Sequence, residues 1–97
     1  MRRDEAMDRL RAHEAELRRL GVSSLFMFGS TARDEAGETS DIDLFFDYRK
    51  GELGLFELME VKDYARDLLG GPVDIMTRDS LHKALRKRIE ETALRVF

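Results

Sequence analysis

The stretch from Asp41 to Asp47 constrains the fold more than any other part of the sequence, because its side chains alternate in kind. One face carries Ile42, Leu44 and Phe46, and the other carries Asp41, Asp43, Phe45 and Asp47. A period of two is typical of a β-strand, so Asp41 and Asp43 leave the same face with α-carbons about 6.5–7 Å apart. Adjacent anions repel each other unless a cation lies between them, and aspartate is a poor strand former. We interpret the pair as a metal-binding site, with the solvated face of an edge strand as the alternative.

Apolar periodicity predicts alternating helices and strands along the rest of the chain. Helices are expected at 4–20, at 30–35, at 55–69 and from 79 or 80 towards 97, and strands at 25–28, 41–47 and 73–76. The order αβαβαβα corresponds to an α/β (α+β) fold, with a three-stranded mixed sheet flanked by helices. The apolar residues expected to face inward from the last helix are Leu81, Leu85, Ile89 and Val96.

Length and composition exclude several classes of protein. The chain has 97 residues, no cysteine and a formal charge of −3, and this length fits one domain over residues 1–97. Neither a disulfide scaffold nor a thiolate metal site is possible without cysteine. No apolar run reaches the ~20 residues of a membrane span, and the charged start is unlike a signal peptide, so a cytoplasmic protein without membrane contact is expected. The acidic balance argues against direct nucleic-acid binding.

A third aspartate strengthens the metal interpretation. Asp74 lies between Val73 and Ile75 in a predicted strand, so its side chain faces opposite to theirs. If this strand neighbours the one at 41–47, Asp74 can reach Asp41 and Asp43. Three convergent carboxylates could hold two metal ions roughly 3.5–4 Å apart across a phosphoryl transfer. A turn or capping aspartate near the strand start is an equally good interpretation from local preference alone.

The corner at Gly29-Ser30 follows a short apolar run and precedes the acidic strand. Glycine lets a phosphate approach the backbone, and a helix that begins at Ser30 would direct free N–H groups towards it. Arg33, one turn further, could balance the charge of a triphosphate. Strand–Gly–Ser–helix is most often only a turn with a helix cap, and a solvated Arg33 is about equally plausible.

The last predicted helix is basic on its outer side. Such a face is typically solvated near a helix C-terminus, where cations are favourable, and a contact with phosphate or an acidic partner is the alternative. Its cationic residues are Lys83, Arg86, Lys87 and Arg88.

Together these residues resemble a known family. Gly29-Ser30, ten further residues and then Asp41-Ile42-Asp43 match the Gly-Ser-x10-Asp-x-Asp signature of the DNA polymerase β-like nucleotidyltransferase superfamily. Asp74, in Val-Asp-Ile-Met-Thr, resembles the third carboxylate of that family. The resemblance covers essentially the whole chain. By length and by its Ser-Asp-Ile-Asp-Leu run the chain is similar to the minimal nucleotidyltransferase (MNT) branch, often found as the antitoxin partner of a HEPN-domain ribonuclease toxin.

The resemblance implies a nucleotidyl transfer that depends on two Mg²⁺ ions. Asp41, Asp43 and Asp74 would bind the ions as catalytic residues, and Gly29 and Ser30 would hold the β- and γ-phosphates of a nucleoside triphosphate, expected to be ATP. A hydroxyl, activated with help from Asp74, would attack the α-phosphate and displace pyrophosphate. In the antitoxin branch the acceptor is a tyrosine of the toxin, whose RNase activity is thereby silenced.

Three functions remain open from the sequence. The first is AMP transfer to a partner protein, which would also supply the surface that an added domain supplies in larger family members. The second is an antitoxin that masks its toxin by contact alone. The third is a subunit of a small-molecule nucleotidyltransferase, such as one that modifies an aminoglycoside.

Overall fold

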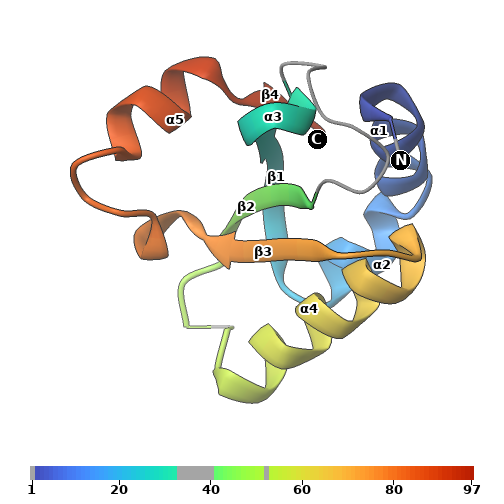
Figure 1. Cartoon of the computed structure of the whole chain (residues 1–97). Helices are drawn as coiled ribbons and strands as arrows, with labels where there is room; N and C mark the ends of the chain where they lie inside the picture. Colours follow the sequence, from blue (N-terminus) through green and yellow to red (C-terminus); the bar gives the residue numbers. More distant parts are fainter. Residues whose placement is uncertain (1, 33–40, 52) are drawn as a thin grey trace.

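The computed structural model describes residues 2–32, 41–51 and 53–97. Figure 1 shows that helices and strands are interspersed along the chain, as the predicted fold class requires. They are α1 (Arg3–Ala12), α2 (Glu14–Arg19), β1 (Val22–Phe28), α3 (Gly29–Ala32), β2 (Ile42–Tyr48), α4 (Leu55–Leu69), β3 (Val73–Thr77), the 3-10 turn η1 (Arg78–Ser80), α5 (Arg86–Thr92) and β4 (Leu94–Arg95). None of the helices in these described ranges has the length and apolar composition of a membrane span.

Four strands form one mixed sheet in the order β3-β2-β1-β4. β2 is antiparallel to β1 and parallel to β3, and β4 is antiparallel to β1. The prediction of a mixed sheet flanked by helices is therefore confirmed, but the predicted number of three strands was wrong. β4 was missed because it pairs only with the outer edge of β1, where the Val96 N–H donates to the Leu25 carbonyl at 2.8 Å. Pairing that edge satisfies backbone groups that an open edge would leave exposed.

The last helix also differs from the prediction. The chain instead forms η1, an extended Leu81 and the short α5, before β4 begins. Leu81 and Val96 are buried as predicted, whereas Leu85 is 51% exposed. The need to pair the edge of β1 and to bury Val96 against it outweighs local helix preference here, since propensity is readily overridden by tertiary contacts.

The helix predicted at 55–69 coincides with α4, and local signals explain why. The Glu57 side chain accepts a hydrogen bond from the Gly54 N–H at 3.0 Å and so satisfies a donor before the helix start. Gly70 ends the helix with φ of 68°, a left-handed conformation that glycine adopts without steric cost. The helix predicted at 4–20 is instead two helices, because His13 leaves helical geometry between α1 and α2.

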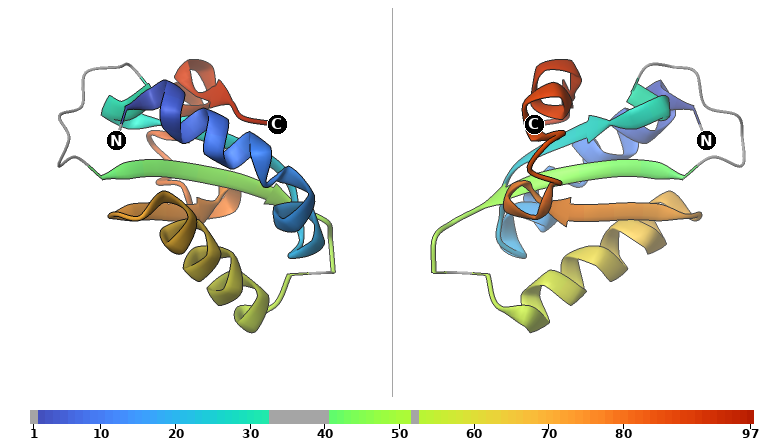
Figure 2. Two further views of the ribbon diagram at one scale, coloured as in Figure 1. Left: turned by 90° about the vertical axis from the view of Figure 1, so that its right-hand side faces the viewer. Right: turned by 60° about the vertical axis from the view of Figure 1, so that its left-hand side comes forward.

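The two faces of the sheet have different surroundings. α1 and α4 contact each other and cover one face, as Figure 2 shows. On the second face Phe26 stacks on Phe45 with ring centroids 4.9 Å apart, and α5 is tied to this face by an ion pair between Arg78 and Glu90. The alternation predicted for β2 thus directs successive side chains to two faces with different surroundings. Fully buried residues of the first face include Ala6, Leu10, Leu25, Met27, Leu44, Phe46, Val61 and Ala65.

Candidate active site

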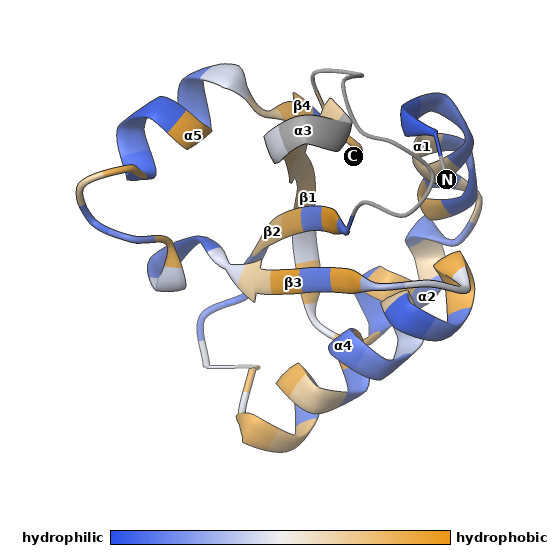
Figure 3. Ribbon diagram, in the orientation of Figure 1, coloured by the Kyte–Doolittle hydropathy of each residue, from blue (hydrophilic) through white to orange (hydrophobic). Residues whose placement is uncertain are grey.

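Two aspartates lie side by side where β2 and β3 run in parallel. Asp43 and Asp74 are direct partners in the register of these strands, so both side chains leave the same face of the sheet. Neighbouring strands are about 4.8 Å apart, which brings the two carboxylates into close proximity. Figure 3 shows a hydrophilic band on β2 beside a hydrophilic band on β3, each within an apolar strand. Asp41 lies one residue before β2 and is exposed.

The electrostatic environment of Asp43 is unfavourable for its charge. Burial, then the negative charges of Asp74 and Asp41, raises the pKa of the Asp43 carboxyl above its ordinary value. Within the described ranges, no Lys, Arg or His side chain forms an ion pair with Asp43. A half-buried carboxylate that is surrounded by like charges favours binding of a cation at this position.

Gly29 packs directly against this carboxylate. It follows Phe28, the partner of Asp43 in β1, and has φ of 77°, in the left-handed region that favours glycine. A Cβ atom at this position would lie within 2.4 Å of Asp43 Oδ2, so any other residue would collide with the acid. The glycine thus keeps the corner open beside the carboxylates. Ser30 follows it in the backbone of α3, and Arg33 lies outside the described residues.

The chemistry of the donors fits Mg²⁺, which usually takes one or two carboxylates together with phosphate oxygens and water. Asp43 and Asp74 can supply those carboxylates, and their mutual repulsion gives a physical reason for a cation between them. Over the described parts of the chain, no group of three or more acidic or histidine side chains is arranged to hold an ion by itself.

A pocket of about 210 Å³ adjoins the same corner. It lies between the end of β1 and α5, so Gly29 borders both this pocket and the Asp43 carboxylate. Its walls are mostly apolar, with one cationic side chain. The lining residues are Phe28, Gly29, Leu85, Arg88, Ile89 and Thr92.

Arg78 is a central residue of this face that the sequence analysis did not identify. Its guanidinium donates two hydrogen bonds to the Asp47 carboxylate, at 2.7 and 2.9 Å, and a third to Glu90 of α5 at 2.5 Å. It also lies over the rings of Phe26 and Phe45, 4.9 and 5.1 Å from their centroids. Arg78 therefore connects β2 with α5 across the second face of the sheet.

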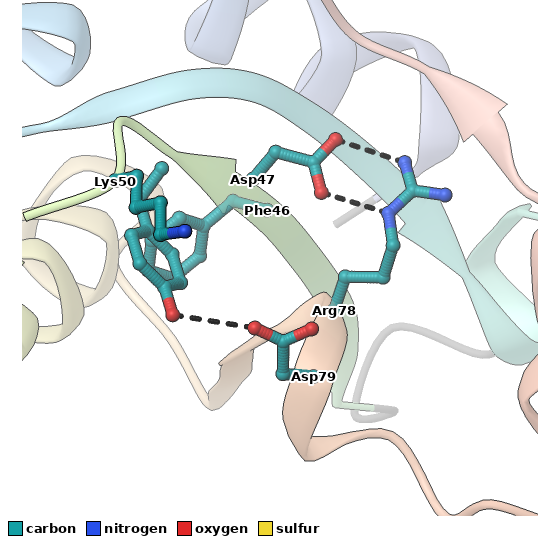
Figure 4. Close-up of a pocket in the computed structure, with 6 residues that line it drawn as sticks. Phe46, Asp47, Lys50, Arg78 and Asp79 are labelled. Atoms are coloured by element: carbon teal, nitrogen blue, oxygen red, sulfur yellow. Dashed lines mark hydrogen bonds and ion pairs between the residues drawn. The ribbon is translucent and has the colours of Figure 1, made fainter.

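Figure 4 shows the Arg78–Asp47 pair at the edge of a second pocket, of about 270 Å³. Opposite the pair, the Tyr48 hydroxyl donates to Asp79 at 3.2 Å, and this hydrogen bond raises the pKa of Tyr48. Two acids and two cations line the pocket, so its charges balance. The lining residues are Phe46, Asp47, Tyr48, Lys50, Arg78 and Asp79.

Comparison with known proteins identifies the family to which the chain is similar. The nucleotidyltransferase domain family matches residues 10–96. A candidate protein adenylyltransferase of Methanocaldococcus jannaschii, MJ1217, is 43% identical over 89 residues, 90% of each chain. The chain belongs to the nucleotidyltransferase domain family. As a member of this family it is a nucleotidyltransferase enzyme.

Further relatives place the nucleotidyltransferase among small members of the family. The protein adenylyltransferase MntA of Thermococcus cleftensis is 38% identical over 81 residues, 82% of this chain and 81% of that one. A solved structure of a candidate minimal nucleotidyltransferase has a TM-score of 0.83 and 32% identity, with 97% of this chain and 95% of the other covered. A toxin–antitoxin crystal structure with AMP-PNP shares the fold, with a TM-score of 0.70 at 18% identity over 90% of this chain and 72% of that one.

Proposed function

We propose that this nucleotidyltransferase transfers AMP from ATP, with Mg²⁺, to a tyrosine of a partner protein in the cytoplasm, and that the partner is a HEPN-domain toxin. The observation that carries the proposal is the Asp43–Asp74 pair in register beside Gly29, because it combines repelling carboxylates with an open backbone corner. A triphosphate with its metal ions satisfies both features, since it supplies the cations for the acids and a group that can approach the glycine.

The reaction assigns a role to each predicted residue. Asp41, Asp43 and Asp74 would hold the metal together with phosphate oxygens of the nucleotide, and the metal would supply neutralisation of charge on the phosphates during the displacement. Gly29 and Ser30 bind the β- and γ-phosphates, and Arg33 balances their charge. The acceptor oxygen forms a bond to the α-phosphorus as the bond to pyrophosphate breaks, and Asp74 helps to take the proton of the acceptor hydroxyl.

Relatives support the choice of acceptor. MntA of Thermococcus cleftensis is named as a protein adenylyltransferase, and two structures with this fold are a toxin–antitoxin complex with AMP-PNP and an MntA–HpeT complex.

The test is incubation with labelled ATP, Mg²⁺ and the protein encoded next to this chain. We expect label on a tyrosine of that protein, and loss of labelling when Asp41→Asn is combined with Asp43→Asn. Asp63→Asn, a charge change at a 72% exposed side chain on α4, is the matched control and should label normally. Labelling that survives the double substitution would contradict the catalytic assignment.

Two other outcomes identify the alternatives. Neutralisation of the partner that persists in the double variant, without any labelling, would indicate masking by contact. Label that moves only to a small alcohol, such as an aminoglycoside, would indicate a small-molecule nucleotidyltransferase. Either result would overturn the proposed protein acceptor.

A further inference from the structure

The pocket between Gly29 and α5 is too small for a whole nucleotide. Pockets that enclose a complete small molecule typically measure roughly 300–1,000 Å³, and this one measures about 210 Å³. It therefore suits one part of a ligand whose remainder lies elsewhere. Gly29 borders the pocket on one side and touches the Asp43 carboxylate on the other, so the remainder would lie at the acid pair.

The walls of the pocket suit a flat aromatic group. Phe28, Leu85 and Ile89 provide apolar contacts from two sides. Leu85 is 51% exposed, although it is a large apolar residue at the start of α5. Apolar surface left open beside a polar site is a common feature of ligand pockets, in which a few polar groups fix the orientation of the ligand.

Arg88 is the cationic residue of this pocket, and its guanidinium is available to a ligand. In the described part of the chain its side chain forms no ion pair, whereas Arg86 on the same helix pairs with Asp79 and Glu90. A guanidinium can stack on a base or donate to ring nitrogens, and an aromatic ring such as that of Phe28 offers a second stacking surface.

The position of α5 is set by a charged network rather than by a buried apolar face, since no residue of this helix is buried. Arg78 links Glu90 of α5 to Asp47 of β2, and Arg86 pairs with the same Glu90. These contacts hold the pocket-lining side of the helix opposite the end of β1. The pocket is therefore part of the folded scaffold.

We propose that this pocket binds the nucleobase of the nucleotide, with Phe28, Leu85 and Ile89 as apolar walls and Arg88 at the rim. The inference rests on the proposed nucleotidyl transfer, which places the phosphates of the same molecule at Gly29 and the acid pair. It assigns base recognition to α5 of this chain, independently of any partner.

The test compares ATP with inorganic tripolyphosphate, which carries phosphates but no base. Affinities of the full chain for each are measured by titration calorimetry with Mg²⁺ present. Leu85→Ala is expected to weaken ATP binding roughly 3–10-fold, because it removes apolar contact area, and to leave tripolyphosphate binding unchanged. Arg88→Gln should show the same selectivity. Leu55→Ala is the matched control, since Leu55 is also an exposed leucine at a helix start, 71% exposed on α4.

Three results would overturn the proposal in distinguishable ways. Unchanged ATP affinity in Leu85→Ala, with the wild type binding ATP normally, would remove the pocket from base recognition and leave the enzymatic proposal intact. The same unchanged affinity with reduced transfer to the partner would assign the pocket to the acceptor side chain. Equal losses of affinity for ATP and tripolyphosphate in Leu85→Ala would place phosphates in the pocket. Failure of the wild type to bind ATP at all would instead contradict the proposed function itself.

Discussion

Asp43 and Asp47 lie on the same strand and the same face of the sheet, yet their environments are opposite. The Asp47 carboxylate accepts two hydrogen bonds from Arg78, and the guanidinium balances its negative charge. The Asp43 carboxylate has Asp74 as its strand partner, and its pKa is raised by burial and then by the charges of Asp74 and Asp41. Two identical residues four positions apart therefore differ in how their charge is met, since Asp47 is paired with an arginine and Asp43 lies beside like charges.

The difference shows what residue type alone does not reveal. An acid with a bidentate arginine is satisfied within the fold and needs no ligand. An acid held beside like charges raises the free energy of the folded chain until a cation binds, which is typical of functional sites. The following experiments test this distinction, from the largest expected effect to the smallest.

The largest effect is expected from Asp74→Asn. Removal of this carboxylate takes one ligand from the proposed metal site and leaves Asp43 there. The rate of AMP transfer should therefore fall roughly 10²–10³-fold. The rate is measured as label transferred from ATP per minute at saturating Mg²⁺. Asp63→Asn on α4 removes the same charge from an exposed position and should keep the wild-type rate. A rate within threefold of wild type in Asp74→Asn would show that the in-register acid takes no part in the reaction.

Gly29→Ala should have the next largest effect. Its Cβ would lie 2.4 Å from Asp43 Oδ2, so the carboxylate must move, and a displacement of this size can lower the rate roughly 10–100-fold. Gly51→Ala is a close control, because Gly51 has φ of 83° and open space around it. Both alanines carry the left-handed backbone cost of about 1–2 kcal/mol, so both variants lose stability.

The comparison of the two glycine variants isolates the collision from the backbone strain. Similar losses of stability with activity reduced only in Gly29→Ala would support contact between the corner and the acid. Equal activity in the two variants would show that the Asp43 carboxylate tolerates a side chain beside it, and that the corner is merely a turn.

Near the end of β2, on the same face of the sheet as Asp43, Asp47→Asn should reduce the stability of the chain. An amide offers one acceptor where the carboxylate offers two, and Arg78 loses its bidentate partner. The pair is partly buried, with 25% and 35% of the two side chains exposed, so a loss of about 1–2 kcal/mol in the free energy of unfolding is expected. Urea unfolding measures the change. The exposed Asp63–Arg66 contact, at 3.9 Å, provides the control, and its loss in Asp63→Asn should cost less than about 0.5 kcal/mol.

Local patterns were sufficient for much of this fold. α4 coincides with its prediction because glycines mark both ends, and β2 follows from strict alternation. The sequence predicted that Asp74 lies near Asp43 only if their two strands are neighbours in the sheet, and the local pattern does not determine that order. The parallel register that pairs them is a property of the whole sheet.

Features that depend on distant partners were missed. β4 exists because the edge of β1 needs a partner, and Arg78 connects residues 31 and 12 positions away. One signal for Arg78 was present. Asp74, Met76 and Arg78 continue a period of two, which directs the arginine to the same face as the acids. The identity of its partners still required the spatial order of the strands.

The smallest expected effect is a gain of stability in Asp43→Asn, beside Asp74 and Asp41. In metal-free buffer Asp43→Asn removes one of several repelling charges, and the free energy of unfolding should rise by roughly 0.2–1 kcal/mol. Because the pKa of Asp43 is raised in the folded chain, the folded wild type binds its proton more tightly than the unfolded chain does. Wild-type stability relative to the variant therefore falls as pH rises from the ordinary value of 3.8 through the raised pKa. The stability that Asp43→Asn gains over the wild type is complete above that pH range and disappears below it.

The sign of this change separates the two aspartates, since Asp43→Asn should stabilise the metal-free chain while Asp47→Asn destabilises it. Addition of Mg²⁺ with ATP should stabilise the wild type more than Asp43→Asn, because binding to the folded state adds its free energy to stability. Thermal unfolding at neutral pH, with and without these ligands, measures both differences. If metal-free Asp43→Asn were less stable than wild type, the Asp43 carboxylate would have an attractive partner in the fold, and the physical reason for a cation between it and Asp74 would be lost.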